Sequence, residues 1–208
     1  MLKGIIFDFD GVIAESVQVK TDAFAEIYKN YGSDIVKKVV EHHEYNGGMS
    51  RFEKIKFYHE SFLDKNITEE EIMDFANQFS DLVVEKVIAA PYVSGAFEYI
   101  QKSYKKYKLF ISTGTPTEEM IQILKGRKID HYFSDVFGSP DKKTIHINNI
   151  RSRYGLKSNE LIYYGDSKSD FDAAVNANIA FVLIKNSFDK KLTDTYRGEI
   201  INNFKGLI

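Results

Sequence analysis

The chain has 208 residues, of which 43% are hydrophobic and 14% aromatic, with no cysteine and a formal net charge of −2 at pH 7. This length predicts one large domain, or one core with a smaller insert, and the charge balance excludes a generic nucleic-acid binder, which would carry a basic excess. The absence of cysteine excludes disulfides, zinc-thiolate sites and cysteine nucleophiles and suits a reducing cytoplasm.

The N-terminal apolar run predicts a buried strand. Residues 4–9 (GIIFDF) are nearly all apolar, which is typical of a parallel strand covered on both faces. The longer apolar run from Gly4 to Ile13 is interrupted by Asp8 and Asp10 and is too short to span a bilayer. It also lacks the layout of a signal peptide, so we expect a soluble cytoplasmic protein.

The next seventy residues or so show only helical patterns. Apolar residues are spaced as in a helix between 16 and 31 and again around 52–58, with a break at Asn46-Gly47-Gly48 between them. Thr68 followed by Glu71 is a typical helix start, in which each side chain bonds the other's backbone. Residues 16–88 are therefore expected to form an all-helical insert.

From Pro91 onward, predicted helices and strands alternate. The expected helices are 96–104, 117–125, 144–154 and 171–176, and the expected strands are 109–112, 135–137, 161–164 and 179–184. A turn is expected at Gly114-Thr115-Pro116, and the weakly patterned segment from Ser187 contains a short strand near Glu199 to Ile201. The alternation predicts an α/β protein with a Rossmann-like parallel sheet and helices on both faces.

The expected strand ends carry a distinctive set of polar side chains. In chain order these are Asp8 and Asp10, then Ser112 and Thr113, then Lys142 and Lys143, and finally Asp166 and Asp170. Ligands of such sheets bind beyond the carboxyl ends of the strands. Carboxylates crowded there repel one another unless a divalent cation lies among them, and oxygen ligands suit Mg²⁺. A metal and a lysine together would let an aspartate attack a phosphoryl group.

Individual residue types in this set also fit phosphoryl transfer. Asp8 and Asp10, two positions apart on an extended segment, point the same way, so that one can attack phosphorus while the other protonates the leaving oxygen. The hydroxyl of Thr113 can donate to a phosphoryl oxygen, and Gly11 allows close approach of the backbone.

These motifs resemble those of the haloacid dehalogenase-like (HAD) hydrolase superfamily, in the same order and over nearly the whole chain. Asp8-Phe9-Asp10-Gly11-Val12-Ile13 is similar to motif I, Ile111-Ser112-Thr113-Gly114-Thr115-Pro116 to motif II, Lys143 or Lys142 to motif III, and Gly165-Asp166-Ser167-Lys168-Ser169-Asp170 to motif IV. The insert after motif I resembles the helical cap of the subclass that includes phosphoglycolate phosphatase and β-phosphoglucomutase. The resemblance implies a core of residues 1–15 and 89–208 and a cap of residues 16–88.

The resemblance also implies a role for each matching residue. Asp8 would be the nucleophile that forms an aspartyl-phosphate, and Asp10 the general acid and base, with its backbone carbonyl on Mg²⁺. Thr113 would bind the transferring phosphoryl group, and Lys143 would pair with that group and with Asp8. The expected metal ligands are Asp8, Asp10, Asp166 and Asp170, and Gly11, Ser112 and Gly114 are expected to lie against the substrate.

Two of these assignments have an alternative in the adjacent residue. Ser112 could replace Thr113, although Thr113 stands directly before Gly114, where many relatives place the hydroxyl. Lys142 could replace Lys143, because the sequence before them departs from the commoner Lys-Pro pattern.

Three basic residues of the expected cap are candidates for substrate specificity. Gly48-Met49-Ser50-Arg51 resembles the cap loop of β-phosphoglucomutase, whose arginine holds a second phosphate. A guanidinium can bind phosphate or carboxylate with two parallel hydrogen bonds, so Arg51 is the first candidate, ahead of Lys54 and Lys20. The five histidines show no metal-ligand spacing and are given no role.

The expected activity is Mg²⁺-dependent hydrolysis of a small anionic phosphate ester, of the sugar or sugar-acid phosphate type. Dehalogenases lack the second motif I aspartate that is present here as Asp10. The alternatives are a sugar-phosphate mutase, a phosphonatase with Lys54 as Schiff base, and a catalytically silent phosphometabolite-binding protein. A mutase is disfavoured by Lys20, where its cap histidine is expected, and by Gly165 before Asp166.

Other expectations concern motion and partners. Hinges near 14–16 and 89–91 should let the cap open and close. We expect a monomer or weak homodimer whose partner is a small-molecule phosphate ester, with no nucleic-acid or membrane partner.

Overall fold

A parallel sheet lies at the centre of the protein, as seen in a computed structural model that describes residues 1–185 and 190–208. Its strand order within these residues is β3-β2-β1-β4-β5-β6, and every neighbouring pair is parallel. The strands are β1 (Gly4–Phe7), β2 (Lys108–Pro116), β3 (Asp135–Ser139), β4 (Leu161–Gly165), β5 (Ala180–Ile184) and β6 (Glu199–Ile201). The predicted α/β fold with a Rossmann-like parallel sheet is confirmed.

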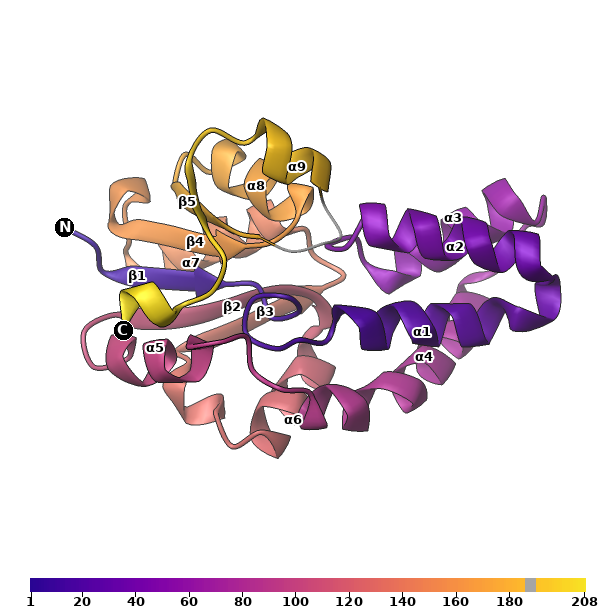
Figure 1. Cartoon of the computed structure of the whole chain (residues 1–208), viewed down its shortest axis with the longest axis horizontal. Helices are drawn as coiled ribbons and strands as arrows, with labels where there is room; N and C mark the ends of the chain where they lie inside the picture. Colours follow the sequence, from indigo (N-terminus) through magenta and orange to yellow (C-terminus); the bar gives the residue numbers. More distant parts are fainter. Residues whose placement is uncertain (186–189) are drawn as a thin grey trace.

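Nine α-helices accompany the sheet in the part of the chain that the structure describes. They are α1 (Val17–Tyr28), α2 (Ser33–Tyr45), α3 (Arg51–Phe62), α4 (Glu69–Ala89), α5 (Ala96–Ser103), α6 (Thr117–Gly126), α7 (Lys143–Tyr154), α8 (Lys168–Asn176) and α9 (Lys190–Thr195). Figure 1 shows α1 to α4 together at one end of the long axis, with the sheet and the remaining helices at the other. We call residues 17–89 the helical unit.

Alternate residues of the central strand face two different hydrophobic clusters. Ile5 and Phe7 belong to the cluster that includes residues of α5 and α6, whereas Ile6 belongs to the cluster that includes residues of α7 and α8. Because side chains alternate across a strand, this division means that the sheet has helices on both faces. Burial on both faces explains why β1 is apolar without alternation.

Aromatic side chains fill the interior of the helical unit. The Phe24 ring lies 4.4 Å from that of Phe79 and 5.7 Å from that of Tyr58, measured between centroids. At the start of α4, Thr68 and Glu71 form the predicted reciprocal capping interaction. No strand occurs among residues 17–89, all of which the structure describes, as the helical pattern predicted.

Three local predictions need correction. The turn expected at residues 114–116 is extended and belongs to β2, because Pro116 still pairs with Ser139 of β3. The helix expected from Phe171 begins at Lys168, because Ser167 caps it through Asp170.

The third correction concerns the first half of the helical unit. Within residues 16–31, α1 ends at Tyr28 and a 3₁₀ turn follows at Lys29–Tyr31. This turn ends at Gly32, whose φ is +95°. The next helix, α2, is a separate element that the spacing did not single out. Part of the weakly patterned segment from Ser187 lies outside the described residues, and the short strand predicted near Glu199 is confirmed as β6.

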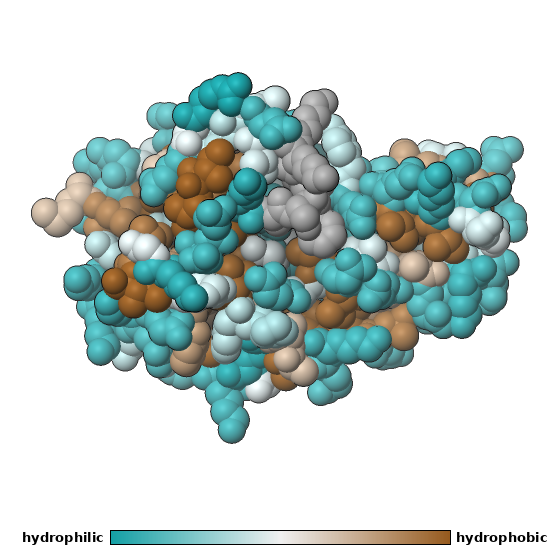
Figure 2. Space-filling model, in the orientation of Figure 1, coloured by the Kyte–Doolittle hydropathy of each residue, from teal (hydrophilic) through white to brown (hydrophobic). Residues whose placement is uncertain are grey.

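Hydrophilic side chains cover most of the face drawn in Figure 2, and the apolar ones gather in several separate groups. Among the described residues, no helix is both long and apolar enough to cross a membrane.

Candidate active site

The strand order brings the two aspartate motifs together. β1 pairs with β2 on one side and with β4 on the other, so the direction of chain progression reverses between β1 and β4. Such a reversal opens a crevice at the carboxyl ends of the strands. Asp8 directly follows β1, and Asp166 directly follows β4. Two segments far apart in sequence therefore deliver carboxylates to one place.

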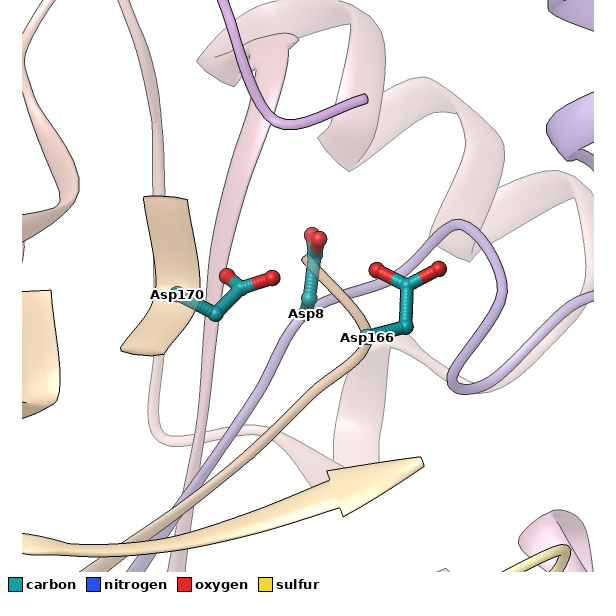
Figure 3. Close-up of side chains that lie close together, drawn as sticks. All are labelled: Asp8, Asp166 and Asp170. Atoms are coloured by element: carbon teal, nitrogen blue, oxygen red, sulfur yellow. The ribbon is translucent and has the colours of Figure 1, made fainter. Parts of the chain in front are cut away.

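Three buried carboxylates converge in this crevice (Figure 3). Asp8, Asp166 and Asp170 each offer one oxygen, and these oxygens lie within 4.8 Å of one another. Asp170 stands in the first turn of α8, and its carboxylate also accepts hydrogen bonds from the hydroxyl and the backbone N–H of Ser167. A set of hard, anionic oxygen donors at this spacing fits Mg²⁺.

Lys143 is the cation that contacts two of these carboxylates. It is the first residue of α7 and is buried, and its Nζ donates to Asp8 Oδ2 at 2.8 Å and to Asp170 Oδ1 at 2.6 Å. Burial lowers the pKa of Lys143, but Asp170 and Asp8 raise it more, so that the net shift is upward. The ammonium is therefore charged at neutral pH.

One lysine does not balance the negative charge of the cluster. Burial raises the pKa of Asp8, and Asp170 and Asp10 raise it further, against the lowering effect of Lys143. The result is a pKa of about 7, which is several units above the usual range of an aspartate. A divalent cation at this point would stabilise the ionised form of Asp8.

Asp10 has a different environment, although it is only two residues away. Its Oδ1 accepts from the hydroxyl of Ser16 at 2.6 Å, and its Oδ2 accepts from Lys20 Nζ at 2.5 Å. Lys20 also donates to Thr115 Oγ1 at 2.7 Å. Burial raises the pKa of Asp10, but Lys20 and Ser16 outweigh it, so the pKa lies below its ordinary value. The pKa values of the two motif I carboxylates are thus shifted in opposite directions.

The geometry distinguishes the adjacent candidates that the sequence left open. Ser112 and Thr113 are both buried, but the Ser112 hydroxyl bonds to His146 Nδ1 at 2.9 Å, whereas Thr113 lines a cavity together with Gly114 and Lys143. Lys142 is exposed, and it is Lys143 that reaches Asp8. Of the adjacent candidates, Lys143 is thus the lysine that contacts the carboxylates, and Thr113 lines a cavity that Ser112 does not line.

Glycines allow backbone to pass close to the carboxylates. Gly11 has a φ of +75°, and a Cβ there would lie 2.2 Å from an oxygen of Asp166. A Cβ on Gly48 of the helical unit would lie 1.8 Å from the hydroxyl oxygen of Ser169, and one on Gly114 would lie 3.2 Å from the carbonyl oxygen of Gly48. The loop that precedes α3 is therefore in close contact with the strand ends.

A pocket separates the carboxylates from the interior of the helical unit. Its wall includes Asp8, Asp10 and Asp166 from the sheet side, and the three basic residues singled out from the sequence from the other side. These are Lys20 on α1 and Arg51 and Lys54 on α3. The fold thus gathers all the predicted specificity residues in the same pocket as the predicted nucleophile.

The three cations differ in what they bind. Both terminal nitrogens of Arg51 donate to the Glu119 carboxylate, at 2.8 and 2.5 Å, and one of them also donates to Ser80. Glu119 lies on α6, so this buried pair connects the helical unit to the sheet. Lys54 is buried and contacts His43 Nδ1 at 2.8 Å.

Sequence reasoning did not find Glu119, His43 or His146. Glu119 stands in the first turn of a predicted helix, where an acidic residue is common, and no local pattern links it to Arg51. His43 and His146 were given no role because neither has a partner at metal-ligand spacing. Both are instead buried beside residues of the site.

Comparison with known proteins identifies the same family. A family profile described as "Haloacid dehalogenase-like hydrolase" matches residues 5–184. A "Phosphorylated carbohydrates phosphatase" of Thermotoga maritima is 26% identical over 191 residues, which cover 86% of this chain and 82% of the relative. A "Phosphoglycolate phosphatase" of Pasteurella multocida is 27% identical over 127 residues, which cover 57% of this chain and 56% of the relative.

A solved structure shows the same fold over the whole chain. The crystal structure of a β-phosphoglucomutase from Clostridium difficile has a TM-score of 0.80 and 20% sequence identity, and the match covers 100% of this chain and 94% of that one. At this identity the likeness shows the fold alone.

We predict that His146→Gln makes the protein less sensitive to acid. Burial and the nearby Lys143 lower the pKa of His146 to about 4, so the folded state binds the proton more weakly than the unfolded state does. The neutral imidazole of His146 therefore contributes fully to the free energy of unfolding above about pH 6.5, and this contribution is lost as the pH falls toward about 4. Urea unfolding at several pH values should show that acid lowers the free energy of unfolding by about 3 kcal/mol less in the variant than in wild type. His131→Gln, at an exposed position, is the control, and parallel curves for wild type and His146→Gln would contradict this.

We also predict that Glu119→Gln weakens the contact between the helical unit and the sheet. The substitution leaves the buried Arg51 guanidinium without its carboxylate, which costs up to about 3 kcal/mol if the unit stays in place. Small-angle scattering should therefore show a larger radius of gyration than for wild type. Glu118→Gln, at the adjacent exposed position, should leave the scattering unchanged, and an unchanged curve for Glu119→Gln would show that the pair does not hold the two parts together.

Proposed function

Because the chain belongs to the haloacid dehalogenase-like hydrolase family, we propose that it hydrolyses the phosphate ester of a small, anionic phosphorylated metabolite, of the sugar or sugar-acid phosphate type. The observation that carries this proposal is the contact of Lys143 with Asp8 beside two further buried carboxylates. Relatives named as phosphatases of phosphorylated carbohydrates and of phosphoglycolate support the same substrate class.

We propose that the chain has two functional parts. Residues 1–15 and 89–208 would form the catalytic core, and residues 16–88 a cap. The two connections run side by side, since the N–H of Glu15 donates to the carbonyl of Pro91 at 2.9 Å and that of Val93 to Ile13 at 3.0 Å. Adjacent connections of this kind suit a hinge that opens the pocket to substrate and closes it against water.

The proposed cofactor is Mg²⁺. Asp8, Asp166 and Asp170 would hold it, with the backbone carbonyl of Asp10 as a further ligand. The three carboxylates fit because they are hard donors, close together and buried, with an excess of negative charge that raises the pKa of Asp8. When bound, the ion would neutralise charge on the transferring phosphoryl group and on the nucleophile.

Asp8 would act as the nucleophile. One of its oxygens attacks phosphorus, so that an Asp8–phosphorus bond forms while the bond to the ester oxygen breaks, giving an aspartyl-phosphate. Lys143 reduces the repulsion between this carboxylate and the phosphoryl oxygens. The hydroxyl of Thr113 would donate to one of those oxygens.

Asp10 would act as the general acid and then as the general base. It gives a proton to the departing ester oxygen and later takes one from the water that attacks the aspartyl-phosphate, which releases inorganic phosphate and restores Asp8. Ser16 and Lys20 hold the Asp10 carboxylate in a fixed orientation. They also favour its ionised form, which is the form that the second step needs.

A sugar-phosphate mutase would use the same steps as far as the aspartyl-phosphate. The fold does not distinguish a mutase from a phosphatase, because a β-phosphoglucomutase has the same fold as this chain. The features that favour hydrolysis are Lys20 next to Asp10 and the Gly165-Asp166 pair. We also propose that the enzyme acts in the cytoplasm, which the absence of cysteine supports.

We predict that Asp8→Asn abolishes phosphate release. A panel of sugar phosphates, sugar-acid phosphates, phosphoglycolate and nucleotides should reveal wild-type hydrolysis, and the variant should be slower by more than about a thousandfold because the nucleophile is lost. The variant should also form no acid-labile phosphoenzyme. Asp34→Asn, an exposed position on α2, is the matched control. Turnover retained in Asp8→Asn would refute the mechanism, and isomerised sugar phosphate in place of free phosphate would identify a mutase.

We predict that activity requires Mg²⁺. Treatment with EDTA should abolish hydrolysis, and added Mg²⁺ should restore it, because the carboxylates repel the substrate without a cation. Asp166→Asn should raise the Mg²⁺ concentration needed for half-maximal activity by about tenfold or more, since one ligand charge is lost. Full activity in EDTA would contradict the assignment of the metal.

A further inference from the structure

Lys54 is a fully buried lysine in the wall of the substrate pocket. It is 1% exposed and shares the pocket wall with Asp8 and Asp10, although it belongs to α3 of the helical unit. Lysine is almost never buried to this degree unless its charge is paired. The groups that contact the Lys54 ammonium therefore indicate whether it can still bind an anion.

Within the described residues, no carboxylate forms an ion pair with Lys54. Its Nζ contacts the neutral ring nitrogen Nδ1 of His43 at 2.8 Å and lies 5.7 Å from the centre of the Phe24 ring. Lys20 and Arg51, which line the same pocket, are each bound to a carboxylate of the sheet side. Lys54 thus differs from its neighbours in having capacity for an anion that the protein does not itself supply.

The charges around Lys54 reinforce this difference. Burial lowers its pKa well below the ordinary value, and Lys20 and Lys143 lower it further, with Asp10 acting in the opposite direction. Burial and Lys54 together lower the pKa of His43 as well. The ionisable groups that line the pocket are Asp8, Asp10, Lys20, His43, Glu44, Arg51, Lys54 and Asp166.

We propose that Lys54, positioned by His43, is the specificity residue that binds the second anionic group of the substrate, a carboxylate or a second phosphate. The inference rests on the proposed phosphatase function and narrows its substrate class to esters with an anionic group remote from the scissile phosphate. Arg51, the first candidate from the sequence, instead serves mainly to hold the helical unit to the sheet through Glu119.

The ammonium would gain more from such a ligand than either neighbour. An anion at Lys54 supplies the missing counter-charge at a buried position, where a charge-assisted hydrogen bond is strong. Arg51 and Lys20 would first have to give up bonds to Glu119 and Asp10. Binding an anion to Lys54 would also raise its pKa, so the complex should take up a proton.

The test compares matched esters that differ only in the second group. Phosphoglycolate is compared with hydroxyethyl phosphate for the carboxylate, and propanediol bisphosphate with propanediol monophosphate for the phosphate. In wild type, kcat/KM should be higher for the ester that carries the second anionic group in at least one pair. That pair shows whether the site binds a carboxylate or a second phosphate. Lys54→Met should reduce the ratio of the two kcat/KM values by about tenfold to a hundredfold, mainly through KM.

Lys56→Met is the matched control, because Lys56 is an exposed residue of the same helix. The ratio of the two kcat/KM values in Lys56→Met should equal that of wild type. Thermal unfolding of both variants verifies folding, and Lys54→Gln provides a second substitution if Lys54→Met is unstable. An unchanged ratio in folded Lys54 variants, or an equal loss on both members of each pair, would overturn the proposal.

A binding measurement separates this inference from the proposed function. Calorimetry of phosphoglycolate and of propanediol bisphosphate in the Asp8→Asn background, in two buffers of different ionisation enthalpy, should show proton uptake for the selected probe, and Lys54→Met should remove it. This result stands even if wild type hydrolyses no ester, in which case only the phosphatase proposal fails. Proton uptake that persists in Lys54→Met, or covalent trapping of Lys54 by borohydride with an aldehyde-bearing phosphonate, would overturn the anion assignment.

Discussion

The arrangement of the site depends on one ammonium group shared by two carboxylates. Lys143 Nζ bonds to Asp8 and to Asp170, which are 135 and 27 residues away from it in the chain. These bonds require the end of β1 and the first turns of α7 and α8 to meet at one edge of the sheet. Since the cluster still has more negative than positive charge, the same arrangement also creates the demand for a divalent cation.

The helical unit completes the site by adding positive charge across the pocket. Lys20 and Arg51 form ion pairs that cross from the helical unit to the sheet, with Asp10 and Glu119. These pairs bring the unit close enough for Gly48 to lie against Ser169. The near-neutral charge of the whole chain therefore conceals an acidic edge of the sheet that faces a basic wall of helices.

Much of the carboxylate site could be predicted from local patterns, because its residues lie directly after the ends of strands. Asp8 and Asp166 lie directly after apolar runs that are unmistakably buried strands, and parallel strands place such residues at one edge. The extended conformation of residues 114–116 was not predictable, because Gly and Pro favour a turn locally and only pairing with β3 overrides this preference. Similarly, the helical spacing of apolar residues in 16–31 could not show that a second helix starts directly after Gly32.

The sequence by itself determined the fold class, the helical insert and the identity of the carboxylates, since these depend on periodicity and on short motifs read along the chain. Tertiary structure alone decided which cations are available. All three basic residues, Arg51, Lys20 and Lys54, were candidates from the sequence. In the structure Glu119 neutralises Arg51 and Asp10 neutralises Lys20, whereas Lys54 contacts His43 and the Phe24 ring and forms no ion pair with a described carboxylate. The physical reason is that the strength of a charge in a pocket depends on its desolvation and on partners distant in sequence, and neither is encoded in the spacing of neighbouring residues.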